Sequence, residues 1–179
     1  MKRKAKDSTL GEFIFLDRMR YDISNTVTIL GCTLWSYVHP TAESKVAITI
    51  NDFSLVKKWT IETYKEAHVE DVRWLSQQWS EIKTKEPQRR IVVLTHHAPS
   101  YMNTSNPKYE GSSVASAFVT EMTEKPFWNS PLVAWGFGHT HWNCDFVHNG
   151  VRIVSNQRGY ELSGGAAKRT FVPDKIVSI

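Results

Sequence analysis

The chain has 179 residues, which is enough for one domain with a hydrophobic core and too short for two domains of ordinary size. Its composition, with 41% hydrophobic and 22% charged residues and seven Trp, excludes a disordered protein. The net charge of +4 and the pI of about 9.1 are mild, and no basic stripe interleaved with aromatic residues follows the basic N-terminus. Nucleic-acid binding is therefore not the expected function.

Cysteine content and hydropathy address the cellular setting. Cys32 and Cys144 form neither a CxxC motif nor a disulfide framework, which favours reduced thiols inside the cell. No apolar run approaches the ~20 residues of a membrane span, and no signal-type apolar region follows the basic N-terminus. We expect an intracellular, cytoplasmic protein without a membrane partner, folded as a single domain over residues 1–179.

The N-terminal half is predicted to start with strands and to continue with helices. Gly31 interrupts an apolar run, which indicates a bulge or a point of close approach. Asn51 and Asp52 are good helix N-caps, and Pro87 ends the helical pattern. The expected elements are two strands, a β-like stretch and two helices, at residues 12–16, 26–35, 46–50, 51–67 and 69–84.

The C-terminal half is predicted to alternate strands with loops. Residues 91–95 and 131–137 are apolar runs without alternation, which suits strands buried on both faces. Asn149-Gly150 between apolar runs indicates a hairpin over 143–155. The remaining expected elements are a long loop, a short helix and a final strand, at residues 98–112, 113–122 and 175–179. This order indicates an α/β fold with a mixed sheet.

Two histidine clusters directly follow the two buried strands. His96-His97 comes after 91–95, and Gly138-His139-Thr140-His141 comes after 131–137. Ligands of open α/β sheets bind beyond the carboxyl ends of the strands, and neutral imidazole suits Zn, Fe and Mn. A lone histidine after a strand is more often structural, but two clusters at two strand ends predict a metal or phosphate site. Gly138 is expected to permit a tight approach, and the long loop to border the site.

Other histidine motifs fit poorly. A site like that of the metallo-β-lactamases requires His-X-His-X-Asp-His, but Asn143 and Cys144 occupy the last two places. An amidohydrolase carries His-X-His at the start of a long barrel, whereas fewer than forty residues follow this motif. We expect the remaining context-free histidines to lie on the surface: His39, His68 and His148.

These residues resemble a known superfamily. Val93–Ser100 and Gly138–His141 look like the last two metal-binding motifs of the calcineurin-like metallophosphoesterases. Three further segments resemble a branch of small, single-domain members: Leu30–Trp35, Asn51–Phe53 and Asn156–Tyr160. The likeness covers roughly residues 12–173, nearly the whole chain.

The resemblance implies a four-layer αββα sandwich that hydrolyses a phosphate mono- or diester with metal-activated water. It implies two divalent ions, such as Mn, Fe or Zn, with His96 and His139 on one ion and His141 on its neighbour. The partner is then a small phosphoester substrate. Packing is the alternative role for the residues that the resemblance places on the substrate side, namely His97, Asn156, Arg158 and Tyr160.

The chain departs from the family pattern at its start. The motifs Asp-X-His, Gly-Asp-X-X-Asp and Gly-Asn-His-Glu/Asp, which supply carboxylates and the general-acid histidine, do not occur, and Asp145 is the only carboxylate near a histidine cluster in the sequence. We therefore expect an N-terminally truncated, incomplete sandwich with an uncovered apolar face, marginal stability and impaired activity. Two alternatives are a non-catalytic remnant, pseudoenzyme or interaction module, and a single Zn site on the same three histidines.

Overall fold

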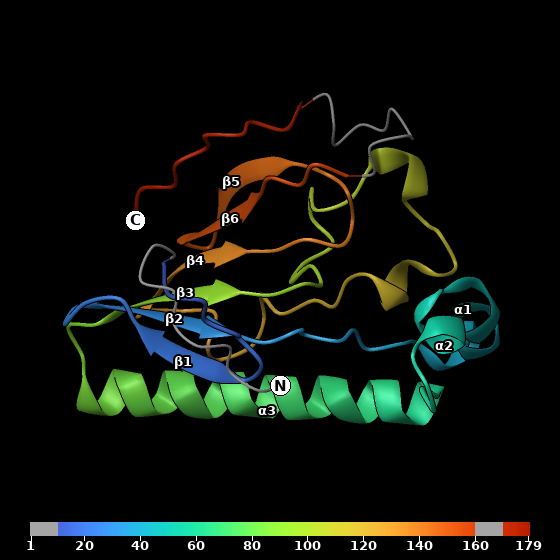
Figure 1. Cartoon of the computed structure of the whole chain (residues 1–179), viewed down its shortest axis with the longest axis horizontal. Coiled ribbons are helices and arrows are strands. Elements are labelled where there is room, and N and C mark those ends of the chain that lie inside the picture. The colour runs from blue at the N-terminus through green and yellow to red at the C-terminus, as the bar shows by residue number, and fades with distance from the viewer. Residues whose placement is uncertain (1–10, 160–169) are drawn as a thin grey trace.

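A computed structural model describes residues 11–159 and 170–179 and centres on one six-stranded mixed sheet (Figure 1). The strand order is β1-β2-β3-β4-β6-β5, in which the four central strands run parallel and the two outer strands are antiparallel to their neighbours. The strands are β1 (Met19–Asp22), β2 (Val27–Gly31), β3 (Arg90–Leu94), β4 (Leu132–Gly136), β5 (Cys144–His148) and β6 (Val151–Ser155).

One long helix, α3 (Ile61–Lys85), lies along the sheet, and the shorter helices gather beyond one end of the strands (Figure 1). Thr60 caps α3, because its hydroxyl accepts from the backbone N–H of Thr63 while the Thr63 hydroxyl accepts from that of Thr60. The short helices are η1 (Pro40–Ala42), α1 (Glu43–Thr49), α2 (Asp52–Leu55), η2 (Pro107–Tyr109) and η3 (Ala115–Ala117). The chain is thus a mixed α/β protein, and the finer expectation of an incomplete four-layer sandwich stays a prediction.

The two faces of the sheet are unequally buried. Leu30, Val93, Trp135 and Ile153 lie side by side in register, and all four are buried in the core that includes Leu75 of α3. On the opposite face, Ile29 and Val92 are only half-buried, and Leu94 is 37% exposed. Covering of this face is uneven, because Ala134 and Val154 on the same face are buried, and the expected uncovered apolar face stays a prediction.

The parallel strands confirm the predictions that rested on unbroken apolar runs. The runs at 91–95 and 131–137 become β3 and β4, and the predicted hairpin becomes β5 and β6, with Asn149 and Gly150 both at positive φ. The strand predicted at 26–35 ends early, at Gly31. Leu34 then adopts φ +53°, a left-handed conformation that a continuing strand does not allow.

Predictions on the N-terminal side were less accurate. No strand forms at 12–16, and the edge strand is β1 instead. The β-like stretch at 46–50 is mostly helical, because Ala42, Val46 and Ile50 recur at steps of four and are all buried. The helix predicted at 51–67 is broken: α2 ends at Leu55, and the predicted 69–84 helix starts earlier, at the cap Thr60.

Two further predictions were wrong near the C-terminus. The helix expected at 113–122 is reduced to the 3₁₀ turn η3. The strand expected at 175–179 does not form, because arginine side chains rather than a strand ladder hold this segment. Arg90 donates to the carbonyl of Ile179 at 2.8 Å, and Arg152 donates to that of Ser178 at 2.9 Å. None of the helices in the described ranges is both long and apolar enough to cross a membrane.

Gly31 is a point of close approach, as the sequence predicted. A Cβ at this position would lie 2.5 Å from the Cβ of Leu16, a contact that side-chain rotation cannot relieve. We expect Gly31→Ala to lower the free energy of unfolding by about 1–3 kcal/mol. Urea denaturation measures this loss, and Leu16→Gly, which removes that Cβ, should restore part of it in the same chain. Gly138→Ala is the matched control, since its Cβ would lie an ordinary 3.5 Å from His96 Nδ1.

Candidate metal centre

The loops that follow three neighbouring parallel strands are joined at their first residues. The backbone N–H groups of His96 and His97, just after β3, both donate to the carbonyl of Thr33, after β2, at 3.1 Å. The N–H of Gly138, after β4, donates to the carbonyl of His96 at 3.0 Å. These bonds bring the two histidine clusters together at the carboxyl ends of the strands.

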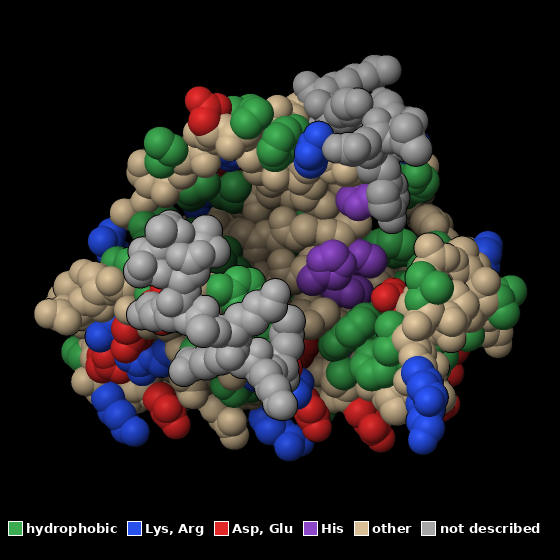
Figure 2. Space-filling view, in the orientation of Figure 1, with side chains coloured by type: hydrophobic (Ala, Val, Ile, Leu, Met, Phe, Trp, Pro, Cys, Tyr) green, Lys and Arg blue, Asp and Glu red, His purple; other side chains and the backbone are tan. Residues whose placement is uncertain are grey.

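Three imidazoles form one compact group. The nearest ring nitrogens of His96, His97 and His139 all lie within 4.8 Å of one another. The His139 ring stacks on that of His97 with centroids 4.2 Å apart, and on that of Phe118 at 4.6 Å. His139 adopts φ +66°, and this backbone conformation, rather than a close approach at Gly138, directs its ring into the group. Figure 2 shows histidine side chains gathered beside a hollow in the molecular surface.

Burial keeps these imidazoles neutral. It lowers the pKa of His97 far below its ordinary value of 6.5, and the neighbouring His139 adds to this effect. Burial, then the charges of His96 and His141, lower the pKa of His139 to about 3. Partial burial also lowers the pKa of His96, against the opposing charge of Asp52. Neutral imidazole is the form that binds metal ions.

Two buried nitrogens in the group have no hydrogen-bond partner within the described residues. These are the Nε2 atoms of His97 and His139. Leaving a buried polar atom unpaired costs about 1–3 kcal/mol, so ordered water or a bound ion is expected to satisfy these nitrogens.

Hydrogen bonds on the far side of His97 indicate which of its nitrogens carries the proton. Its Nδ1 lies 2.7 Å from the hydroxyl of Ser36, which is fully buried. Tyr64 donates its own hydroxyl hydrogen to the carbonyl of Ala117 at 2.8 Å and also contacts Ser36. The tyrosine oxygen can therefore accept from Ser36, and the serine oxygen from His97 Nδ1–H. In this arrangement Nε2 of His97 presents a lone pair to the cluster.

His141 lies at the edge of the cluster. It is not one of the three grouped imidazoles, but its charge lowers the pKa of both His96 and His139. Its backbone N–H donates to the side chain of Gln157 at 2.9 Å, and Gln157 also donates to the carbonyl of Trp142 at 3.1 Å. Gln157 thus anchors the turn that carries His141.

The residues expected on the substrate side are divided. His97 joins the imidazole group itself. The side-chain amide of Asn156 is bound to the backbone of Val172, donating at 2.7 Å and accepting at 3.0 Å, which supports its alternative role in packing. Arg158 is exposed, and Tyr160 lies outside the described residues.

The remaining histidines and Asp145 have other surroundings. His39 is exposed, as predicted, and His148 is half-buried at the end of β5. The prediction for His68 was wrong: it lies inside α3, is 7% exposed, and its Nδ1 bonds to the carbonyl of Trp35. Asp145 forms ion pairs and does not join the cluster; its partners are Arg152 and Lys175.

Comparison with known proteins finds a similar viral protein but identifies no family. No family model matches the chain. It is similar to "Uncharacterized protein L509" of Acanthamoeba polyphaga mimivirus, with 29% identity over 156 residues, which cover 82% of this chain and 55% of the relative. The chain thus spans about half the length of this relative, and the relative's name states no activity.

Sequence reasoning missed three residues of the site: Ser36, Phe118 and Asp52. Ser36 and Phe118 contact His97 and His139 from loops 61 and 21 residues away in the chain, as the residue numbers show. No local pattern marks either contact. Asp52 was assigned a capping role and a place in the Asn51–Phe53 segment of the family likeness but no role at the site, although its charge acts on His96. The sequence did offer one signal for these residues. The loops that follow β2 and β3 come after neighbouring parallel strands, so their residues are expected to meet at the same edge of the sheet.

Ser36 offers a test of the His97 assignment. Replacing it with alanine removes the hydroxyl that is hydrogen-bonded to Nδ1 of His97 and orients the imidazole. We expect Ser36→Ala to weaken divalent-metal binding by about 10–100-fold, the usual effect of losing such an outer partner. Calorimetric titration with Zn²⁺ measures the change. Ser116→Ala, which removes a hydroxyl that accepts from the backbone N–H of His39 in the described part of the chain, is the control. Equal affinity in wild type and Ser36→Ala would contradict the assignment.

Proposed function

We propose that this chain carries the imidazole part of a metal-dependent phosphoesterase centre, which hydrolyses a phosphate mono- or diester. The single observation that supports the proposal most is the grouping of three neutral imidazoles, with ligand nitrogens within 4.8 Å, at the carboxyl ends of β3 and β4. The likeness of the surrounding motifs to the calcineurin-like metallophosphoesterases supplies the reaction class. On this proposal the sheet is part of a four-layer sandwich.

The donor set fits a divalent ion. The unpartnered Nε2 atoms of His97 and His139 are buried donors of the kind that Zn, Mn or Fe accepts, and His96 completes the group on its exposed side. The family likeness assigns His141 to a neighbouring ion. A bound divalent ion would stabilise negative charge on phosphoryl oxygens and lower the pKa of water.

The protein residues have definable roles around such an ion. Phe118 stacks on His139 and fixes the plane of its ring, and Ser36 fixes the ring of His97. Asp52 is the carboxylate whose charge acts on His96, so it offsets part of the positive charge that an ion brings to this edge. One such carboxylate provides less anionic charge than a two-metal centre requires, so we expect hydrolysis to be slow.

Hydrolysis of an aryl phosphate monoester and diester with added Mn²⁺ tests the proposal. We expect slow, Mn²⁺-dependent turnover that His139→Ala reduces to the rate of Mn²⁺ in buffer. His39→Ala, at an exposed loop position, should retain the wild-type rate. Equal rates for wild type and His139→Ala on both substrates would reject catalysis by this cluster.

A structural metal site is the second candidate. It is favoured by the absence of any carboxylate from the three-imidazole group found among the described residues. Metal analysis after dialysis distinguishes the two functions. One tightly held ion per chain without hydrolysis indicates the structural site, whereas metal-dependent hydrolysis lost in His139→Ala indicates the phosphoesterase.

A further inference from the structure

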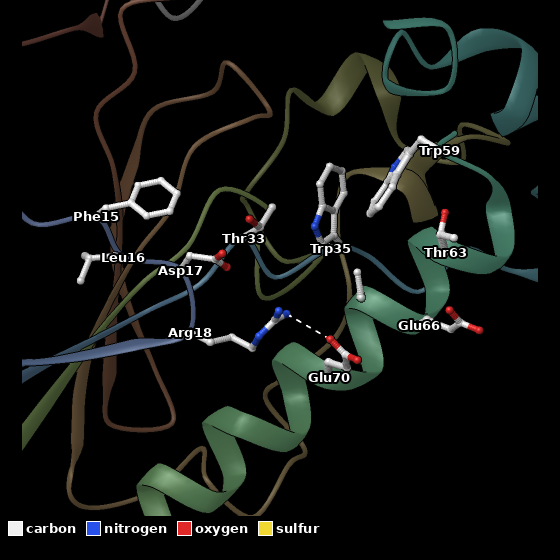
Figure 3. A pocket seen from close by; sticks show the side chains of 11 residues that line it. Phe15, Leu16, Asp17, Arg18, Thr33, Trp35, Trp59, Thr63, Glu66 and Glu70 are labelled. Atoms are coloured by element: carbon white, nitrogen blue, oxygen red, sulfur yellow. Dashed lines mark ion pairs between the residues drawn. The ribbon is translucent and has the colours of Figure 1, made fainter. Parts of the chain in front are cut away.

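A cavity of about 460 Å³ lies beside Trp35, between residues 15–18, the segment after β2 and the first turns of α3 (Figure 3). Its volume is in the range of small-molecule sites. Trp35 lines it and also packs against His97, with ring centroids 5.4 Å apart. The cavity needs a separate explanation, because none of the three grouped histidines lines it.

One wall of the cavity is made of two indoles. Trp35 and Trp59 lie with ring centroids 4.8 Å apart and planes inclined at 49°, and Figure 3 shows both rings at the same side of the cavity. The Nε1 atom of Trp59 is buried without a hydrogen-bond partner in the described part of the chain. The cation–π contacts of the described residues lie elsewhere, at Trp79 and Tyr109, so none of the described Lys or Arg side chains lies over either indole.

The other walls are acidic. Three carboxylates line the cavity, those of Asp17, Glu66 and Glu70, against the single guanidinium of Arg18. That guanidinium is already balanced, because it donates to the buried carboxylate of Asp71 at 3.0 Å and lies 3.4 Å from Glu70. The field inside the cavity is therefore negative beside an aromatic wall, a combination that attracts cations with an apolar surface.

We propose that this cavity binds a small organic cation of the quaternary ammonium class, about the size of choline. The indole faces of Trp35 and Trp59 receive the methylated head group, and the carboxylates of Asp17 and Glu70 compensate its charge. A strongly hydrated inorganic cation would have to lose its water shell to contact the indoles, and a neutral ligand would lack the charge attraction of the carboxylates. The site is independent of the proposed phosphoesterase centre and requires no metal ion.

Titration of the ¹⁵N-labelled protein with choline chloride, at constant ionic strength set with NaCl, tests the proposal by NMR. We expect saturable, one-to-one shifts of the indole N–H signals of Trp35 and Trp59. The uncharged isostere 3,3-dimethylbutan-1-ol should bind at least about tenfold more weakly, because it lacks the cation–π and carboxylate interactions. Equal binding of the isostere, or no saturable shift with choline, would overturn the proposal.

Two variants separate the walls of the cavity. Trp59→Leu should weaken choline binding by about tenfold, and Trp59→Phe should retain part of the affinity. Glu70→Gln should weaken choline binding severalfold. It provides the test of the cavity if Trp59→Leu does not fold. Glu81→Gln, an exposed acid farther along α3 that does not line the cavity, should bind like the wild type. Unchanged affinity in both Trp59→Leu and Glu70→Gln would place choline elsewhere.

Discussion

Acidification of the metal-free protein from pH 6.5 to about pH 4.5 should lower its free energy of unfolding by about 2 kcal/mol for each imidazole that stays neutral when folded. His97 and His139 are the most clearly affected, and burial also lowers the pKa values of His96 and His68. Their pKa values fall below the ordinary 6.5 chiefly because of burial, that of His139 to about 3. In this range the unfolded chain binds protons that the folded chain does not, so stability is full above pH 6.5 and falls as the pH is lowered.

Other groups act differently in the same range. Burial raises the pKa of the Asp71 carboxyl, so that group favours the folded state at lower pH and offsets part of the loss. The Arg20 guanidinium holds the pKa of Asp22 down, and ion pairing lowers that of Asp145 to about 2, so their losses come at lower pH. The window above pH 4.5 therefore reports mainly on histidines.

Urea denaturation at intervals of pH measures the effect. His139→Gln replaces the imidazole with a side chain that does not titrate, so the slope of stability against pH should become shallower by about one proton over the window. His39→Gln, on the exposed loop before η1, is the control and should follow the wild-type profile. A wild-type slope in His139→Gln would show that His139 does not remain neutral in the folded protein.

Unbroken apolar runs were the most reliable guide to the fold. The apolar runs at 91–95 and 131–137 show no alternation and form β3 and β4 in the interior of the sheet, although one face of β3 is only partly buried. β1 was not predictable in this way, because Met-Arg-Tyr-Asp has no apolar run. Charged contacts support it instead: Arg20 pairs with Asp22 and with Glu86, which follows α3.

Helix boundaries depended on which cap the chain uses. Asn51 and Asp52 are good caps by residue type, but the helix that starts there lasts only one turn. The backbone becomes extended again at Val56, directly after α2. The longer helix begins at Thr60, whose reciprocal bonds with Thr63 form a capping box without the usual Glu or Gln. Local residue preference could not decide between these two starts, and packing of the α3 stripe against the sheet did.

The sequence predicted the position of the site, because that position depends on where the strands end, but it did not predict the protonation of its histidines. His96 and His139 each follow a buried parallel strand, so their proximity follows from sheet topology. Their neutrality does not, because it arises from burial and from contacts such as the stacking of Phe118 on His139, which join distant loops. The sequence therefore locates the imidazoles, whereas tertiary packing determines their protonation.

Divalent metal should stabilise the folded protein strongly and through His139. An ion that binds only the folded state adds about 2.7 kcal/mol at one hundred times its Kd, and about 4 kcal/mol at a thousand times. We expect Zn²⁺ to raise the Tm of the wild type and to leave that of His139→Ala unchanged. Differential scanning fluorimetry with and without EDTA measures both shifts. His148→Ala, at the end of β5, is the control and should respond like the wild type.

Proton release distinguishes this site from adventitious binding by surface histidines. Because His97 and His139 are already neutral in the metal-free protein, an ion that binds them near pH 6 displaces no protons from them. Ordinary histidines are largely protonated at that pH and would each lose a proton to the buffer. Calorimetric titration near pH 6 in buffers of different ionisation enthalpy should therefore give nearly the same heat. A heat that varies with the buffer by about one proton or more per ion would place the metal outside the buried pair.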